Sequence, residues 1–307
     1  MNFVSIVVTH NRKELLVEAV NSLINQTVKP GKIIIIDNNS TDGTQDHLSD
    51  ENILQNPLVK YYFVKDNLGG AGGFYFGMKK AIETEKFDWI TLSDDDAIYS
   101  NDYFEHISDA IKSAPNIKAF CGSIYLEDGR IQYTHRRRIA STKRIKEVTI
   151  PVKEYSHNFY VDVFTFVGCV ISRELISKIG LPDKDYFIWY DDVEYSLRIR
   201  EYTKILNVSK AKIVHKTKVI SNDFAAQYKP DWREYYGVRN RLLTIKRHTS
   251  SQLFIFFYIP YYILRSYLDL FRPRFKGFRR HVVYVYTCAY FDALRNKKGK
   301  NPKFLPD

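Results

Sequence analysis

The chain has 307 residues and a formal net charge of +11, and 45% of its residues are hydrophobic, so it can form one large domain or a domain with an appendage. Three scattered cysteines exclude a disulfide framework and a zinc-finger spacing. Residues 229–307 contain 17 Lys and Arg against 5 Asp and Glu, whereas residues 1–228 contain 29 against 30. We therefore predict a near-neutral body and a basic C-terminal part that is attracted to phosphate, in lipid head groups or nucleic acid.

The first hundred residues alternate between strand-like and helix-like segments. Buried strands are predicted by apolar, mostly β-branched runs at 3–9, 32–37, 59–64 and 88–93. Helices are predicted at 13–25 and in a glycine-led segment that ends near Glu85. This order indicates an α/β fold with a parallel sheet covered by helices. Ligands bind beyond the carboxyl ends of such strands, where Thr9, Asp37 and Asp94 would lie.

Three consecutive carboxylates, Asp94, Asp95 and Asp96, follow the fourth strand. Adjacent negative charges repel, and burying them without a counter-charge is costly. Alternate side chains of an extended segment share a face, so Asp94 and Asp96 would point together toward Mg²⁺ or Mn²⁺ while Asp95 turns away. The alternative is an acidic turn that closes the strand.

Four glycines precede this strand, at Gly69, Gly70, Gly72 and Gly73. They match neither a P-loop nor the dinucleotide fingerprint. Such glycines allow a ligand to approach the backbone at a helix N-terminus, which suits phosphate. A flexible turn is the alternative.

The region 117–158 is less regular, and its basic runs at 136–138 and 143–146 indicate a solvated loop, with acceptor or phosphate contact as the alternative. An apolar strand with one glycine is predicted at 161–171.

Bulky aromatic residues then lead into a second pair of carboxylates. Phe187, Trp189 and Tyr190 precede Asp191 and Asp192, after which helical spacing begins. Aromatic rings beside carboxylates suit a sugar face and a desolvated general base. Simple helix capping is the alternative. 

A further strand, 211–215, ends in a single histidine, His215. It is either a structural residue or the group that completes a metal site with the aspartates.

Taken together, these pieces resemble the family 2 inverting glycosyltransferases of GT-A fold over about residues 3–245. The resemblance rests on the sequences at 8–12, 36–42, 94–96, 189–198 and 214–215. Within that family, the stretches 67–74 and 235–240 are most similar to bacterial galactofuranosyltransferases, followed by rhamnosyltransferases. The implied fold is a Rossmann-like, mostly parallel sheet in a catalytic domain, 1–228, with a helical basic-aromatic region, 229–307.

The resemblance also implies roles for individual residues. Donor-binding positions would be Thr9, Asn11, Arg12, Asp37, Asn38, Asn67, Gly69, Gly70, Gly72, Gly73 and Asp95. Asp94, Asp96 and His215 would hold Mg²⁺ or Mn²⁺. Asp192 would be the general base and Asp191 a sugar or acceptor ligand, with the reverse assignment open. Further substrate contacts would come from Trp189, Tyr190, Tyr236 and Arg239.

The implied reaction is transfer of a sugar from a nucleotide-sugar donor to a hydroxyl of a lipid-linked cell-surface glycan. UDP-galactofuranose is the favoured donor and dTDP-rhamnose the second. A sugar-nucleotide pyrophosphorylase is disfavoured because the segment after the first strand lacks glycine. Nucleic-acid binding is disfavoured because carboxylates cluster at the strand ends and would repel a polyanion.

The C-terminal part is predicted to begin with a helix at 231–248. The apolar run 253–264 has only 12 residues, against about 20 for a membrane-spanning helix. Its aromatic and arginine content suits a helix in the membrane interface, on an enzyme at the cytoplasmic face of the plasma membrane. The alternatives are a core-packing subdomain or a homo-oligomer contact. We expect the basic tail at 297–300 to be disordered.

Overall fold

The computed structural model describes residues 1–217 and 227–306. The main sheet comprises β1 (Phe3–Thr9), β2 (Lys32–Asp37), β3 (Val59–Phe63), β4 (Trp89–Asp94), β5 (Ala97–Tyr99), β6 (Ala119–Tyr125), β9 (Phe159–Val161), β11 (Cys169–Ser172) and β12 (Ile205–His215). The helices around it are α1 (Lys13–Ile24), α2 (Thr44–Asp50), α3 (Gly69–Thr84), α4 (Tyr103–Ser113), α5 (Arg173–Ile179) and α6 (Asp191–Arg200).

The strand order is β3-β2-β1-β4-β11-β6-β12-β5, and β9 also pairs with β12. The strands β3, β2, β1, β4, β6 and β12 run in one direction, and β11, β5 and β9 run against them. The predicted α/β fold with a mostly parallel sheet is therefore confirmed. The antiparallel insertion of β11 between β4 and β6 is a feature that the sequence pattern did not predict.

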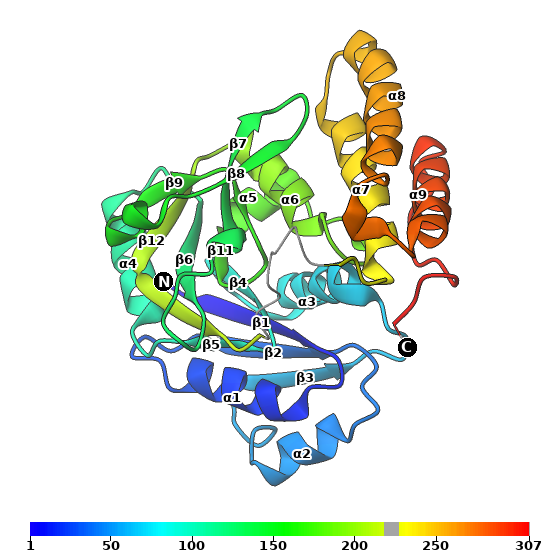
Figure 1. The fold of residues 1–307 in the computed structure, drawn as a ribbon. Coiled ribbons are helices and arrows are strands. Elements are labelled where there is room, and N and C mark those ends of the chain that lie inside the picture. The colour runs from blue at the N-terminus through cyan, green and yellow to red at the C-terminus, as the bar shows by residue number, and fades with distance from the viewer. Residues whose placement is uncertain (218–226, 307) are drawn as a thin grey trace.

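Alternation along the strands builds a core on each face of the sheet. Ile6 and Ile34 face α3, α5 and α6, whereas Val7 and Ile33 face α1, α2 and α4. Both faces are covered, which is why these strands read as continuous apolar runs. In Figure 1 the blue helices α1 and α2 lie on one side of the sheet and the cyan helix α3 lies on the other.

A second, small sheet forms from β7 (Arg136–Ser141), β8 (Lys146–Thr149) and β10 (Val163–Phe164). The solvated loop expected at 136–138 is therefore wrong, because β7 pairs with both other strands. Arg136 is fully buried, and its guanidinium donates to the carbonyls of Gly122, His135 and Val167. The strand expected at 161–171 is interrupted, and Gly168, with φ of +65°, lies just before β11.

The C-terminal region forms three helices, α7 (Arg233–His248), α8 (Gln252–Asp269) and α9 (Arg279–Leu294), which stand together beside the sheet (Figure 1). The predicted helix at 231–248 is confirmed as α7. The tail that we expected to be disordered is packed on the protein: the Gly299 amide donates to Asp185 O at 2.7 Å, and Phe304 stacks on Tyr235. Within the described ranges, no helix is long and apolar enough to span a bilayer.

Candidate active site

A cleft of about 630 Å³ opens beyond the carboxyl ends of β1, β2 and β4, and the start of α6 also lines it. It brings together the predicted residues Thr9, Arg12, Asn38, Asn67, Gly69, Gly70, Asp94, Asp95, Asp96, Trp189, Tyr190, Asp191, Asp192 and His215. Among predicted residues that do not line it are Asn11, Asp37, Gly72, Gly73, Tyr236 and Arg239. This volume lies in the range of small-molecule sites.

β4 ends at Asp94, and Asp95 and Asp96 form the turn before β5, so the strand alternation that we expected does not set the directions of the three carboxylates. One ligand atom from each of Asp94, Asp96 and His215 lies within 4.8 Å of the others. His215 reaches the group because the end of β12 pairs with β5, which places His215 opposite Ala97. Asp95 turns away and accepts a hydrogen bond from Thr9 Oγ1 at 2.7 Å.

The three groups have the character of a divalent-cation site. Burial, followed by repulsion from Asp96 and Asp95, raises the pKa of Asp94 to about 8. Burial also raises the pKa of Asp95, to about 6, although Arg12 opposes the shift. A cation bound here would relieve both penalties, and carboxylate and imidazole groups are suitable ligands.

The hydrogen bonds around His215 leave one nitrogen directed at the aspartates. Its Nδ1 lies 2.8 Å from Gln132 Oε1, and its Nε2 lies 2.9 Å from Asp96 Oδ1. Burial lowers the pKa of His215 and raises that of Asp96, but the contact between the two groups outweighs burial and reverses both shifts. Without a cation the two groups therefore form a buried ion pair. A bound cation would take the place of the shared proton, and imidazole and carboxylate are suitable ligands, so the residues fit the implied ion.

Arg12 forms the cationic side of the same cluster. Its Nη1 lies 2.8 Å from Asp96 Oδ2 and 3.2 Å from Asp95 Oδ1. About half of the side chain is exposed to the cleft, so the guanidinium has donors left for an anionic ligand.

Two of the predicted donor-binding residues, Asp37 and Asn11, support the loops around the cleft but do not line it. Asp37 is buried and accepts hydrogen bonds from Tyr61 Oη and the Ser40 amide. Asn11, at φ of +55°, accepts a hydrogen bond from the Thr41 amide. Both fix the loops after β1 and β2 rather than the cleft surface.

Asn38 connects the end of β2 to the start of α3. Its amide nitrogen donates to Asn67 Oδ1 and Gly69 O, and its oxygen accepts from the Leu68 amide. Asn38 therefore lines the cleft and also holds the glycine-led turn in place.

The four glycines serve two purposes. A Cβ at Gly69, whose φ is +69°, would overlap the Phe187 carbonyl, and Gly70 has open space in front of it. A Cβ at Gly73 would lie 2.6 Å from Val8 Cγ1, and one at Gly72 would lie 2.5 Å from Leu68 Cβ. Gly69 and Gly70 thus border the cleft, while Gly72 and Gly73 allow α3 to pack closely on its neighbours.

The second carboxylate pair begins α6. Asp191 is 7% exposed, and the Asp192 side chain is 18% exposed. Burial raises the pKa of both groups, and repulsion from Asp192 adds to the shift of Asp191. Arg137, with Nη2 at 3.9 Å from Asp192 Oδ2, opposes the rise at Asp192 alone. Asp192 is therefore the carboxylate that gives up its proton more readily, which suits a general base.

Among the cleft residues that sequence reasoning missed are His135 and Arg137. Both come from the segment that we expected to be a loop. The His135 ring lies 5.0 Å from that of His215 and hydrogen-bonds to Thr165 Oγ1. The basic run 136–138 was a visible signal, but only the pairing of β7 shows that Arg136 points into the core and Arg137 into the cleft.

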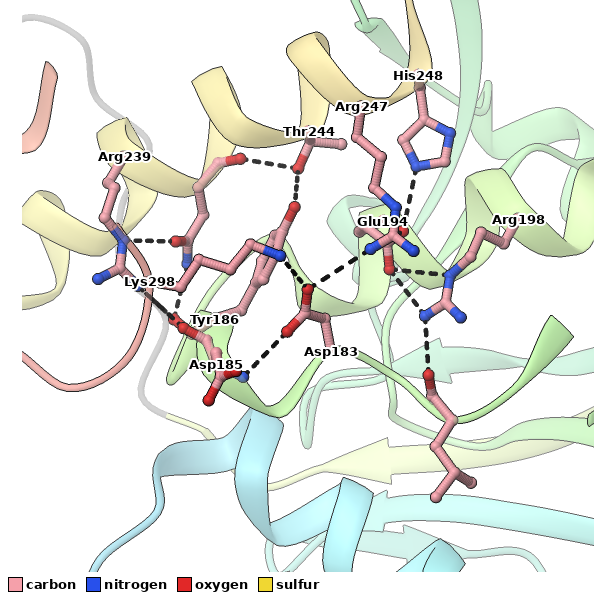
Figure 2. Close-up of polar contacts among 12 residues, drawn as sticks. Asp183, Asp185, Tyr186, Glu194, Arg198, Arg239, Thr244, Arg247, His248 and Lys298 are labelled. Carbon is pink, nitrogen blue, oxygen red and sulfur yellow. Dashed lines mark hydrogen bonds and ion pairs between the residues drawn. The ribbon is translucent and has the colours of Figure 1, made fainter. Parts of the chain in front are cut away.

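Tyr236 and Arg239 are not brought into the cleft. Tyr236 is fully buried and donates to Phe304 O. Arg239 is 1% exposed, and its guanidinium donates to the carbonyls of Gly299, Asp185 and Tyr186. Figure 2 shows Arg239 reaching from α7 to this backbone. Their contacts are with the protein itself.

A mostly parallel sheet with a strand-end carboxylate–histidine cluster and an aromatic, acidic helix start defines a glycosyltransferase of GT-A fold. The chain belongs to Glycosyl transferase family 2, whose sequence model matches residues 5–180.

Several characterised proteins are similar in sequence. Galactofuranosyltransferase GlfT1 of Mycobacterium tuberculosis is 29% identical over 208 residues, 64% of this chain and 63% of that protein. GlfT1 of Mycolicibacterium smegmatis is 27% identical over 205 residues, 64% of each. The chain thus spans just under two thirds of these relatives. The dTDP-rhamnosyl transferase RfbF of Shigella flexneri is 24% identical over 257 residues, 80% of this chain and 81% of RfbF.

Solved structures share the fold at low identity. GalNAc-T7, crystallised with UDP, GalNAc and Mn²⁺, superposes with a TM-score of 0.62 at 17% identity, over 80% of this chain and 48% of that one. Staphylococcus aureus TarS, residues 1–349 in complex with UDP-GlcNAc, gives a TM-score of 0.54 at 17% identity, over 82% and 69%.

Proposed function

We propose that the protein is a metal-dependent inverting glycosyltransferase that moves a hexose from a nucleoside-diphosphate sugar to a hydroxyl of a cell-surface glycan. One observation carries the proposal: the Asp94–Asp96–His215 cluster and the Asp191–Asp192 pair line the same cleft. A group suited to a diphosphate-bound cation and a group suited to proton abstraction are the two requirements of a single displacement at an anomeric carbon.

In this mechanism Asp94, Asp96 and His215 hold Mn²⁺ or Mg²⁺. When bound, the ion neutralises charge on the leaving diphosphate. Arg12 contributes a further positive charge beside the same carboxylates. Asn38, Asn67 and the backbone at Gly69 and Gly70 line the part of the cleft that would receive the nucleotide.

Asp192 takes the proton of the acceptor hydroxyl, a contribution of typically about 10²–10⁴-fold. The hydroxyl oxygen forms a bond to the anomeric carbon from the face opposite the leaving group, and the bond to the diphosphate breaks. The nucleoside diphosphate leaves, and the configuration inverts. Asp191, held protonated by its raised pKa, donates a hydrogen bond to a sugar or acceptor hydroxyl. Trp189, 43% exposed in the cleft, offers an apolar face to a sugar ring.

For the donor we favour UDP-galactofuranose, because the galactofuranosyltransferases match 64% of this chain at 27–29% identity. A second candidate is dTDP-rhamnose. It is favoured by the RfbF match, which extends over 80% of this chain.

For the acceptor we propose a lipid-linked glycan reached at an anionic membrane surface, on the cytoplasmic side. The support is a row of exposed apolar side chains along α8 and just beyond it: Leu253, Phe256, Phe257, Tyr261, Leu264, Leu268 and Phe271. They recur at three- and four-residue steps and so share one face. Exposed arginines, Arg265 and Arg272, border this row. An apolar stripe with flanking cations suits insertion at the head-group boundary.

The test is a thermal-shift panel of UDP, dTDP, GDP and ADP, each with Mn²⁺ and with EDTA, followed by transfer assays with the matching sugar nucleotides. A ligand bound only to the folded state at 100 times its dissociation constant adds about 2.7 kcal/mol. A Mn²⁺-dependent shift with UDP supports galactofuranose, and one with dTDP alone supports rhamnose. A shift with neither nucleotide, and no transfer from either donor, would overturn the proposal.

A further inference from the structure

The short loop that delivers the catalytic carboxylates has an unusual backbone. Phe187, Trp189 and Tyr190 have φ of +67°, +62° and +69°. Side chains other than glycine rarely adopt this left-handed region, and such residues persist only where the surroundings hold them. The loop runs directly into α6, so its conformation decides where Trp189, Asp191 and Asp192 point.

The holding groups come from α7, in the C-terminal region. Asn240 is fully buried, and its side-chain nitrogen lies 2.8, 3.0 and 2.8 Å from the carbonyl oxygens of Tyr186, Ile188 and Trp189. Its two hydrogens are thus shared among three acceptors of one loop. The Asn240 oxygen accepts from Arg239 Nε at 3.0 Å, which fixes the orientation of the amide.

Arg239 contacts the N-terminal end of the same loop. Its Nη2 donates to Tyr186 O at 3.1 Å and to Asp185 O at 3.3 Å, and its Nη1 donates to Gly299 O at 2.6 Å. In the described part of the chain it forms no ion pair with a carboxylate, so its buried charge faces backbone carbonyls. Figure 2 shows Arg239 beside the Tyr186 backbone and Lys298 reaching Asp183 of the same segment.

The loop is also in contact with α3 and with the surface of α7. The Ala71 amide donates to Phe187 O at 3.1 Å, the one carbonyl from Tyr186 to Trp189 that Asn240 does not contact. A Cβ at Gly237 would lie 2.7 Å from Trp189 Cε3, so the indole rests on bare helix backbone. The loop is therefore held between the glycine-led start of α3, which borders the donor part of the cleft, and α7.

We propose that Asn240, supported by Arg239, is a positioning residue that holds the Tyr186–Tyr190 loop in the backbone conformation that presents Trp189, Asp191 and Asp192 to the cleft. The inference rests on the proposed function for its catalytic consequence. It assigns the 235–240 motif to the geometry of the acceptor side rather than to substrate contact, and it makes α7 part of the catalytic apparatus.

The first test measures the loop directly, by hydrogen exchange of peptides that cover 183–192 in Asn240→Ala. Loss of the three carbonyl contacts is expected to speed exchange there by about 10-fold or more, while β1 and β4 keep their protection. The matched control is Asn207→Ala. Asn207 is an equally buried asparagine in β12 that donates to Ser123 Oγ and does not contact the loop.

The second test separates positioning from stability. Gly237→Ala places a methyl group against Trp189 and should leave α7 at least as stable, since alanine is the better helix former. For both Asn240→Ala and Gly237→Ala we expect kcat to fall about 10- to 100-fold, with Mn²⁺-dependent nucleotide binding within about two-fold of wild type. Asn207→Ala should keep its kcat.

Unchanged exchange at 183–192 in Asn240→Ala, or an equal kcat loss in Asn207→Ala, would overturn the inference. Arg239→Lys adds a check on charge. If Arg239 served substrate by its charge, lysine would retain most of the activity, whereas a forked contact to carbonyls is lost. If the wild-type protein transfers no sugar, the proposed function fails, yet hydrogen exchange still decides whether Asn240 holds the loop.

Discussion

Arg137 Nη2 lies 3.9 Å from Asp192 Oδ2, and the same guanidinium pairs with Glu147. β7 carries Arg137, and β8, its hairpin partner, carries Glu147. The small sheet therefore sets the charge environment of the carboxylate that we assign as the base. Burial raises the pKa of Asp192, and Arg137 is the main group that opposes the rise.

This relationship predicts a shifted pH profile for Arg137→Gln. A base acts as the carboxylate, so activity is lost as pH falls through its pKa. Without the cation, the pKa of Asp192 should rise further, because a nearby opposite charge favours the ionised carboxylate. The acid limb of kcat/KM should therefore move to higher pH, with a larger loss at pH 6 than at pH 8. Arg137→Lys, which keeps the charge, should keep the limb; a uniform loss at all pH values would contradict this role.

In the proposed metal-binding cluster, we expect Asp94→Asn to stabilise the metal-free fold and to lower transfer activity. Its pKa in the folded protein, about 8, is above its ordinary value, so it penalises the metal-free fold increasingly as pH rises toward 8. Asp94→Asn should remove that penalty. Metal-free Asp94→Asn should melt higher than wild type at pH 8 and nearly equally at pH 4, measured by thermal unfolding with EDTA.

The same variant should lose the Mn²⁺-dependent shift with UDP and most of the transfer activity. Asp109→Asn, at an exposed position on α4, is the matched control and should change neither property. Retention of full Mn²⁺ dependence in Asp94→Asn would exclude Asp94 as a ligand.

The residues at the strand ends could be predicted because residues close together in the sequence carry the signal. Three consecutive carboxylates at the end of one strand mark a site, and a second strand ends in His215, which we propose as a further metal ligand. Aromatic residues before Asp191 and Asp192 likewise carry a chemical signal that needs no knowledge of the fold. These groups lie together because the carboxyl ends of parallel strands share one edge of the sheet.

The misplaced residues depend on contacts between distant segments. Arg136 reads as a solvated charge, yet in the core its guanidinium donates to the carbonyls of two distant residues, Gly122 and Val167, and of its neighbour His135. We expected Arg239 to contact substrate, but it lies against the loop before Asp191 and donates to the carbonyls of Asp185 and Tyr186. A basic side chain that donates hydrogen bonds to backbone carbonyls of distant segments leaves no pattern in the sequence around it. Sequence spacing therefore cannot reveal its burial.

Ion pairs of Glu194 join the C-terminal region to α6, the helix that begins with Asp191 and Asp192. This fully buried carboxylate of α6 lies 2.9 Å from Arg198 Nη2, 3.1 Å from Arg247 Nη1 and 3.2 Å from His248 Nε2 (Figure 2). Glu194→Gln should lower the free energy of unfolding by about 3–5 kcal/mol, because it leaves buried cations without their partner.

The measurement is urea unfolding at pH 7. Burial raises the pKa of Glu194, but His248 and Arg198 outweigh it, so its stabilisation is lost as pH falls through that lowered value. The difference between wild type and Glu194→Gln should therefore shrink in acid. Arg247→Met is the matched comparison: its side chain is 43% exposed, so it should cost only about 1 kcal/mol or less. Equal losses in the two variants would argue against a buried network.

The exposed stripe of α8 predicts binding to anionic membranes. Phe256 and Phe257 are 71% and 66% exposed, and each would bury apolar surface at the head-group boundary. The double variant Phe256→Ser/Phe257→Ser should weaken binding to vesicles of phosphatidylglycerol and phosphatidylcholine by about 10²–10⁴-fold, since burying each phenylalanine is worth about 1.5–3 kcal/mol. Co-sedimentation measures the effect.

Tyr202→Ser, at an aromatic position just after α6 that is 58% exposed, is the control and should bind as wild type does. Wild-type binding should also weaken with salt and with removal of the anionic lipid, because Arg265 and Arg272 border the stripe. If the double variant binds vesicles as tightly as wild type but shifts from a dimer to a monomer, the stripe is a contact between copies of the chain instead.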